Sequence, residues 1–218
     1  MVEADCPYVS RGGVKLAAAL DRFAIDPAGW SCADLGGSIG GFTDCLLQAG
    51  AGHVYYLDTA YGDLAWKLRQ EPRVTVLERT NALHFDPAAE LTDFAGCELV
   101  TVDLGWSRQT KAIPAALRWL KNNDASRIIT LIKAHYEAPA PTGGSSKSQR
   151  PRSKRKGKGK AARPKRPPLT ETLAQAIVEQ TLADLQAHAV TALDWCRSPI
   201  TGAKGGNPEY LALLAPER

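Results

Sequence analysis

Short apolar segments alternate with amphipathic segments along most of this chain of 218 residues. The apolar segments predict strands at 30–36, 53–58, 74–79, 98–106, 127–137, 189–199 and 208–216. The amphipathic segments predict helices at 14–25, 41–51, 63–70, 113–123 and 169–189, the last with Thr170 as its N-cap. Strands that alternate with helices form a mostly parallel sheet covered on both faces, so we expect an α/β protein.

The end of the chain departs from this alternation. Only SPITGAKGGN lies between the last two predicted strands. That segment is too short for the helical crossover that parallel neighbours need, so these two strands are expected to pair antiparallel. Five parallel strands followed by an antiparallel hairpin make a seven-stranded, Rossmann-like sheet. This is the layout of a class I S-adenosylmethionine-dependent methyltransferase.

One segment carries the excess positive charge. Between Lys147 and Arg166, 11 residues are Lys or Arg and none is acidic, which leaves 16 basic and 23 acidic residues elsewhere. The surrounding stretch 139–168 is rich in Pro, Gly and Ser, so we expect a disordered insertion that interrupts a single domain over 1–218. Clustered Lys and Arg favour phosphate binding and hence an RNA partner. A solvated loop with no dedicated partner is the alternative.

Cysteine, histidine and hydropathy patterns exclude several classes. The five cysteines form no CxxC pair and the four histidines have no ligand spacing, so we expect reduced thiols and no metal. No run of about 18 apolar residues predicts a membrane span. The first residues also lack the basic and apolar regions of a signal peptide. We therefore expect a cytoplasmic protein with no membrane partner.

A glycine-rich loop follows the first predicted strand. DLGGSIGGFT opens the next helix and has the spacing D-x-G-x-x-x-G, which differs from the dinucleotide fingerprint. No GK[ST] follows, so a P-loop is excluded. Glycines let a backbone approach a ligand closely and adopt positive φ, which suits the tail and sulfonium of S-adenosylmethionine. The loop residues expected to contact this cofactor are Asp34, Gly36, Gly37, Ser38, Gly40, Gly41 and Phe42.

Polar residues at two further strand ends are candidates for the same cofactor. Asp58 lies 22 residues after Gly36, the interval at which an acidic residue accepts hydrogen bonds from ribose hydroxyls. Its neighbour Thr59 is included in the site. Asn81, after the third strand, can present its amide to an adenine edge. Taken singly, Asp58 or Asn81 could equally be a polar strand terminus.

Several ordered motifs resemble one known family. YVSRGGVKLAAAL, DLGGSIGGFTDCLLQAGA, YLDTAYGDLAWKLRQEPRV, ERTNAL and SPITGAKGGNPEYLALL are similar to TlyA-type ribosomal RNA 2'-O-methyltransferases, a hemolysin-named branch of the FtsJ-like group. The resemblance covers 8–137 and 169–215. It implies S-adenosylmethionine as methyl donor and ribosomal RNA as the acceptor.

The resemblance also implies a catalytic tetrad. The FtsJ-like group uses a Lys-Asp-Lys-Glu set, which the matching motifs assign to Lys15, Asp103, Lys133 and Glu209. Lys133 would act as general base toward a ribose hydroxyl, helped by partial burial and by the charge of Lys15. Asp103 would orient Lys133 and lie near the sulfonium, so it is also a cofactor contact. Glu209 would fix Lys15 and the ribose, and no metal is required.

The sequence departs from the family pattern in places. TlyA-type proteins usually begin with an S4-like RNA-binding domain, which is not recognised here. The usual loop resembles GASTGG, whereas this chain has Gly37 and Ile39. Trp106 follows the tetrad aspartate and could stack on a base or pack in the fold. Arg11 could meet a phosphate, and residues 139–168 could replace the missing domain.

Other functions remain open from the sequence. A non-catalytic RNA-binding or ribosome-assembly factor with this fold would not bind S-adenosylmethionine. A small-molecule O-methyltransferase would keep its activity without the basic segment. A pore-forming hemolysin is disfavoured because no membrane segment is predicted. The leading prediction is an RNA 2'-O-methyltransferase that acts on ribosomal RNA.

Overall fold

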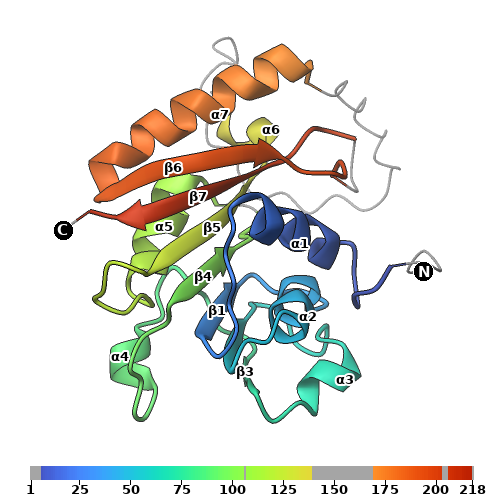
Figure 1. Cartoon of the computed structure of the whole chain (residues 1–218), viewed down its shortest axis with the longest axis vertical. Coiled ribbons are helices and arrows are strands. Elements are labelled where there is room, and N and C mark those ends of the chain that lie inside the picture. The colour runs from blue at the N-terminus through green and yellow to red at the C-terminus, as the bar shows by residue number, and fades with distance from the viewer. Residues whose placement is uncertain (1–5, 106, 139–168, 203–205, 218) are drawn as a thin grey trace, which may run out of the picture.

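The computed structural model describes residues 6–105, 107–138, 169–202 and 206–217. Among these residues, seven strands form one sheet in the order β3-β2-β1-β4-β5-β7-β6 (Figure 1). The strands are β1 (Ser31–Leu35), β2 (His53–Leu57), β3 (Val74–Leu77), β4 (Leu99–Val102), β5 (Arg127–Ile132), β6 (Val190–Arg197) and β7 (Tyr210–Pro216). Strands β1 to β5 pair parallel, and β7 pairs antiparallel with both β5 and β6. The predicted fold class is confirmed.

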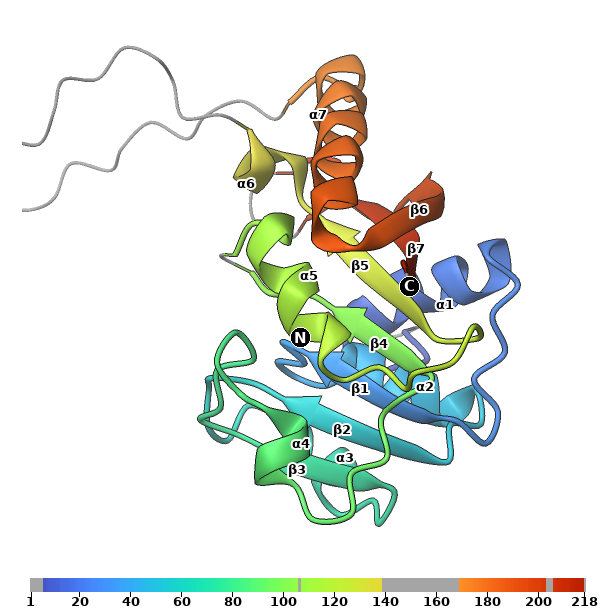
Figure 2. The ribbon, with the colours of Figure 1, turned by 90° about the vertical axis from the view of Figure 1, so that its left-hand side faces the viewer.

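Helices cover both faces of this sheet. They are α1 (Gly12–Arg22), α2 (Gly41–Gln48), α3 (Trp66–Arg69), α4 (Pro87–Glu90), α5 (Gln109–Leu117), α6 (Ala134–Glu137) and α7 (Glu171–Leu185), with a 3-10 turn at Gln186–His188. One core lies under α1, α2 and α3 and includes Leu16, Leu46 and Leu68. The other lies under α5 and α7 and includes Ile113 and Val178. Figure 2 shows α5 and α7 on the side of the sheet opposite α1 and α2.

The central strands are buried on both faces, which explains their continuous apolar sequence. All four residues of β4 are buried, and so are the last five of β5. Parallel strands end together at one edge of a sheet. Consequently the residues that follow β1, β2, β4 and β5 are brought close to one another, and β7 begins at that same edge beside the end of β5.

Several predicted boundaries are wrong, and two of them bear on the site. The fifth strand was expected to run to 137, but β5 ends at Ile132 and the chain turns into the short helix α6. A strand needs ladder partners, and the recorded pairing with β7 ends at Ile132 and Tyr210. Helix α5 begins at Gln109, earlier than expected, and holds Pro114 in its interior. Thr170 is the predicted N-cap of α7, and its hydroxyl accepts from Leu173 N at 3.4 Å.

The predicted basic insertion at 139–168 lies outside the described residues. The strands on its two sides belong to one sheet, since β5 precedes it and β7, its partner, follows it. None of the helices in the described part of the chain is long and apolar enough to span a bilayer. Within the same part, no cluster of three or more His, Cys, Asp or Glu side chains is arranged to hold a metal ion.

Candidate active site

The glycine-rich loop between β1 and α2 is packed against other parts of the protein. Gly36 has a φ of +90°, and a Cβ added there would lie 2.5 Å from the carbonyl oxygen of Asp103. A Cβ on Gly37 would lie 2.4 Å from the ring of Tyr56. Such contacts are far too short, so a side chain at either position would displace β2 or the end of β4.

The second pair of glycines sets the start of α2. Gly40 is its N-cap, has a φ of +99°, and lies where a Cβ would be 2.4 Å from Leu68. A Cβ on Gly41 would be 2.2 Å from Oγ of Ser10, which precedes α1. These glycines therefore allow close approach within the protein itself. The buried ring of Phe42 follows them and lines a cavity described below.

Asp34 at the end of β1 is fully buried. Its Oδ2 accepts hydrogen bonds from N–H and from the hydroxyl of Thr43, at 2.9 and 2.7 Å, and its Oδ1 accepts from the hydroxyl of Thr101 at 3.2 Å. Burial raises the pKa of Asp34 to about 6, while the hydrogen bonds from Thr43 and Thr101 lower it. This carboxyl group thus ties the first turn of α2 to β1 and β4.

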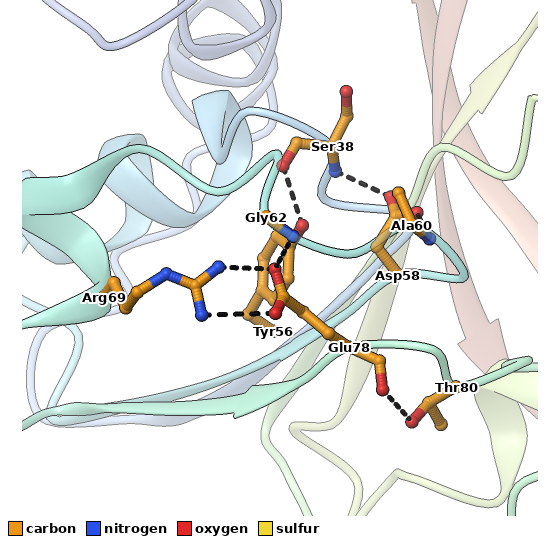
Figure 3. Close-up of polar contacts among 8 residues, drawn as sticks. All are labelled: Ser38, Tyr56, Asp58, Ala60, Gly62, Arg69, Glu78 and Thr80. Carbon is orange, nitrogen blue, oxygen red and sulfur yellow. Dashed lines mark hydrogen bonds and ion pairs between the residues drawn. The ribbon is translucent and has the colours of Figure 1, made fainter.

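Asp58 at the end of β2 is held from two sides. Its Oδ2 accepts from Ser38 N–H and its Oδ1 from Ala60 N–H, both at 2.8 Å (Figure 3). A carboxylate offers roughly four acceptor sites, so two remain for the hydroxyls of a ribose. Asp58 is partly exposed and lines the main cavity, so its carboxylate can accept those hydrogen bonds.

The main cavity opens where β1, β2, β4 and β5 end. Its volume is about 460 Å³, within the usual range for small-molecule sites. It is lined by Gly36, Ser38, Leu57, Asp58, Thr59, Thr80, Asn81, Ala82, Leu83, Asp103, Leu104, Gly105, Ser107 and Lys133. Predicted cofactor residues that follow four strands, β1 to β4, therefore meet in one cavity. The Oδ1 of Asn81 accepts from Leu83 N–H at 3.0 Å, so its amide nitrogen is the group that can donate to a ligand.

A second cavity of about 220 Å³ lies on the other side of the loop. It is lined by Ser10, Arg11, Gly12, Lys15, Asp34, Gly36, Gly37, Ser38, Gly41, Phe42 and Asp103. Gly36, Ser38 and Asp103 line both cavities, so the two spaces adjoin across the loop. Arg11 is exposed at this second cavity. Trp106, the other residue considered for RNA contact, lies outside the described residues.

The four predicted tetrad residues form two ion pairs. Lys15 Nζ donates to Glu209 Oε2 at 2.5 Å, and the two side chains are 12% and 4% exposed. Lys133 Nζ donates to Asp103 Oδ1, and these side chains are 18% and 27% exposed. The antiparallel pairing of β5 with β7 ends where Ile132 faces Tyr210. Lys133 directly follows Ile132, and Glu209 directly precedes Tyr210. The two strands therefore bring the Lys133–Asp103 ion pair and the Lys15–Glu209 ion pair to the same edge of the sheet.

The residues that support the loop were not predicted from the sequence. Tyr56 donates its hydroxyl to Ser38 O at 2.7 Å, and Arg69 makes a two-pronged ion pair with Glu78 (Figure 3). Gly62 N–H also donates to Glu78 at 2.8 Å, which fixes the segment after Asp58. A tyrosine within a predicted buried strand was a detectable signal, because a buried hydroxyl requires a partner.

The residues around the main cavity fit S-adenosylmethionine. Leu57, Ala82 and Leu104 could pack against an adenine ring, and Asn81 could donate to its edge. The carboxylate of Asp58 has acceptor sites left that ribose hydroxyls could use. The tail and sulfonium would then lie toward the loop and Asp103, where the two cavities meet.

A parallel sheet closed by an antiparallel β7, with a ligand cavity at its carboxyl edge, defines a class I methyltransferase fold. Residues 8–156 match the FtsJ-like methyltransferase family, and the chain belongs to that family. The expected cofactor, S-adenosylmethionine, is confirmed by this membership and fold.

Individual relatives agree with the family. The chain is 44% identical over 138 residues to the 16S/23S rRNA (cytidine-2'-O)-methyltransferase TlyA of Mycobacterium tuberculosis. The matched residues make up 63% of this chain and 49% of that protein. Hemolysin A of Brachyspira hyodysenteriae is 34% identical over 205 residues, or 94% of this chain and 75% of that one. The crystal structure of a hemolysin-named protein from Lactococcus lactis has a TM-score of 0.77 at 30% identity, covering 95% and 88%. The chain spans about half the length of the TlyA relative.

Proposed function

We propose that this protein is an S-adenosylmethionine-dependent RNA 2'-O-methyltransferase that acts on ribosomal RNA. The observation that carries the proposal is the pairing of Lys15 with Glu209 and of Lys133 with Asp103 beside the cavity. Family membership and the rRNA methyltransferase named among its relatives support this choice of acceptor. Ribose methylation is favoured because lysine and carboxylate pairs can hold and deprotonate a hydroxyl.

The cofactor would bind across the glycine-rich loop. When bound, it supplies the electrophilic methyl group. In this proposal Asp58 accepts from the ribose hydroxyls, Asn81 donates to the adenine, and Thr59 closes the side of the cavity. Gly36 and Ser38 border both cavities, so their backbone would lie beside the amino-acid tail and the methyl group.

The acceptor would approach from the side of Lys15. A ribose hydroxyl is a weak acid and must lose its proton as its oxygen attacks the methyl carbon. The neutral amine form of Lys133 is the proposed acceptor of that proton and becomes an ammonium in the step, and the contact with Asp103 fixes the position of its Nζ. Lys15, held by Glu209, would bind the nucleotide and align its oxygen for in-line attack.

The RNA partner would be held mainly through phosphate contacts. Arg11 is exposed at the second cavity, next to Lys15, and could bind the phosphate of the target nucleotide. The 11 basic residues between Lys147 and Arg166 would add affinity that depends on salt. Deleting 145–166 should weaken RNA binding and reduce its dependence on salt concentration, as measured by filter binding at two ionic strengths.

Transfer of labelled methyl groups to RNA tests the proposal. Purified wild-type protein is incubated with labelled S-adenosylmethionine and with ribosomal RNA or ribosomal subunits, beside Lys133→Ala. Label that appears on RNA, blocks alkaline cleavage at one nucleotide and disappears in the variant supports ribose methylation. Cofactor binding with transfer only to small hydroxylated compounds would contradict the RNA acceptor. Failure to bind S-adenosylmethionine would favour a non-catalytic RNA-binding factor.

A further inference from the structure

We infer that Tyr56 is a positioning residue for the cofactor, acting through Ser38 on the carboxylate of Asp58. This inference rests on the proposed role of Asp58 in ribose binding. Tyr56 itself is fully buried in β2 and lines neither of the two cavities of the site. Its effect on a ligand must therefore pass through the loop that its ring and hydroxyl contact.

The ring of Tyr56 occupies the space that a side chain at position 37 would need. A Cβ on Gly37 would lie 2.4 Å from both Cδ2 and Cε2 of this ring, and 3.1 Å from Oδ2 of Asp34. Tyr56 is held in place by its strand, which pairs with β1 at Asp34 and with β3 at Val76. A side chain at position 37 would force this ring or its strand to shift, so we expect glycine to be required at 37 as long as the ring of Tyr56 is present.

This complementarity gives a physical reason for a departure noted in the sequence. The loop of the resembling family reads GASTGG, whereas this chain has Gly37 where that pattern has alanine. The aromatic ring fills the volume that a methyl group would otherwise take. The ring also places its hydroxyl within hydrogen-bond distance of the carbonyl oxygen of Ser38, which a smaller residue at position 56 could not reach.

The hydroxyl of Tyr56 holds a strained residue. Ser38 has a φ of +51°, in the left-handed region that non-glycine residues adopt only at an energetic cost. Its carbonyl oxygen accepts from Tyr56 at 2.7 Å, and its N–H donates to Asp58 at 2.8 Å. Burial and the nearby charges of Asp58 and Asp34 raise the pKa of Tyr56, so its hydroxyl keeps the proton that it donates.

The two hydrogen bonds of Ser38 therefore act on the two peptide units that flank its Cα atom, and together they fix the backbone angles of this residue. Tyr56 fixes the carbonyl on one side and Asp58 receives the N–H on the other, as Figure 3 shows. Without the hydroxyl, Ser38 can relax toward negative φ and its N–H turns away from Asp58. The segment after Asp58 is held separately at Gly62, whose N–H donates to Glu78, and Glu78 is held by Arg69. The loss of the Tyr56 hydroxyl should therefore affect only Ser38 and Asp58.

The first test uses the stability of the protein without ligand. Gly37→Ala should lower the melting temperature of the wild type and of Tyr56→Phe by similar amounts, because phenylalanine keeps the ring. In a Tyr56→Ala background the same change should have little effect, since the added Cβ meets no ring. An equal loss in all three backgrounds would overturn the claim that Gly37 and Tyr56 depend on each other.

The second test measures cofactor binding by titration calorimetry with S-adenosylhomocysteine. Tyr56→Phe should weaken binding about fivefold, the usual effect of one lost hydrogen bond. In an Asp58→Asn background the same substitution should change affinity by less than about twofold, because its route to the ligand is already removed. Tyr55→Phe is the matched control, since its ring packs on Phe94 and Trp119 in the opposite core.

The outcomes separate this inference from the proposed function. Wild-type binding with a fivefold loss in Tyr56→Phe that disappears with Asp58→Asn supports both. Wild-type binding that Tyr56→Phe leaves unchanged, or that it weakens equally in both backgrounds, overturns the inference and leaves the proposed function standing. No binding by the wild type would overturn both.

Discussion

The proposed cofactor side of the site and its proposed acceptor side are built by different kinds of contact. On the cofactor side, glycines and backbone hydrogen bonds hold the loop against β2 and β4, as with Gly36, Ser38 and Asp58. On the acceptor side, ion pairs join elements far apart in sequence, and Lys15 lies 194 residues before Glu209. The geometry of the cofactor side therefore depends mainly on close packing, and that of the acceptor side depends mainly on ion pairs.

This difference predicts two separable sets of effects. Changes to the loop should alter affinity for the cofactor and leave the methyl-transfer step largely intact once the site is filled. Changes to the ion pairs should slow transfer and leave cofactor affinity largely intact. A substitution that altered both quantities equally would show that the two sides are not independent.

The largest effect is expected at Lys133. Lys133→Met keeps much of the aliphatic chain and removes the proposed proton acceptor, so the rate of transfer at saturating cofactor should fall by roughly 10²- to 10⁴-fold. Affinity for S-adenosylhomocysteine should change by less than about threefold. Single-turnover transfer to ribosomal RNA measures the rate, and calorimetry measures the affinity.

Lys121→Met provides the matched control for that comparison. Lys121 also pairs with a carboxylate, Glu98, but at the opposite ends of the strands, where β4 and β5 begin. Its loss should leave transfer near the wild-type rate. If Lys133→Met and Lys121→Met lost activity alike, Lys133 would be a structural residue and the assignment of a general base would be wrong.

The next effect concerns the more buried ion pair. Glu209→Gln leaves the ammonium of Lys15 in a nearly buried position without its counter-charge, so the free energy of unfolding should fall by about 1–3 kcal/mol. Transfer should also slow, because Lys15 is no longer fixed. Urea unfolding measures the stability and the methyl-transfer assay measures the rate.

A double variant separates these two consequences. Lys15→Met with Glu209→Gln removes the unpaired charge and should recover much of the lost stability. Its transfer rate should stay low, since the proposed nucleotide contact is gone. Recovery of both stability and rate would show that the pair serves the fold and has no part in the reaction.

The sequence predicted which strand ends carry the candidate residues of both sides, but it did not predict how the loop is packed. The resemblance assigned Lys15, Asp103, Lys133 and Glu209, and the alternation of elements explains why strand ends bring them together. The glycines were expected to approach a ligand, and Gly36 does border both cavities, but Gly36 and Gly37 also pack closely on Asp103 and Tyr56, which was not expected. The glycine pattern in the sequence shows that the loop has room for no side chains there. Only the folded structure shows that the neighbouring groups are the ring of Tyr56 and the carbonyl of Asp103.

The boundaries were missed for a related reason. Pro114 suggested a helix start, yet the helix begins at Gln109, whose N–H donates to Glu137 Oε1 at 3.0 Å. Glu137 lies in the short helix that replaces the end of the predicted fifth strand. This contact between segments distant in sequence helps set the start of α5, and local propensity carries no information about it.

A smaller effect is expected on the cofactor side at Asp58. Asp58→Asn replaces one carboxylate oxygen with a donor facing the N–H of Ser38 or of Ala60, so S-adenosylhomocysteine affinity should fall about tenfold. Transfer at saturating cofactor should change little. Asp63→Asn, at an exposed site in the following segment, is the control. A slower transfer step with unchanged affinity would place Asp58 on the acceptor side.

The smallest effect concerns the buried carboxyl group beneath the loop. Thr101→Val removes the hydroxyl that donates to Asp34 Oδ1, so the pKa of Asp34 should rise above about 6. Because the folded pKa is already above the ordinary value of 3.8, the native state binds this proton more tightly than the unfolded chain does. The stability that Asp34 contributes is present below about pH 4 and is lost as pH rises through 6. In Thr101→Val this loss should occur at a higher pH, because the pKa of Asp34 in the folded protein is higher.

Carbon-13 NMR of the carboxyl group measures the pKa of Asp34. Thr130→Val is the control, since it removes a hydroxyl bonded to Gln109 and should leave the pKa of Asp34 unchanged. An Asp34 that titrates normally near pH 4 would mean that water reaches the base of the loop, and that the cofactor side is less tightly packed than the glycine contacts require.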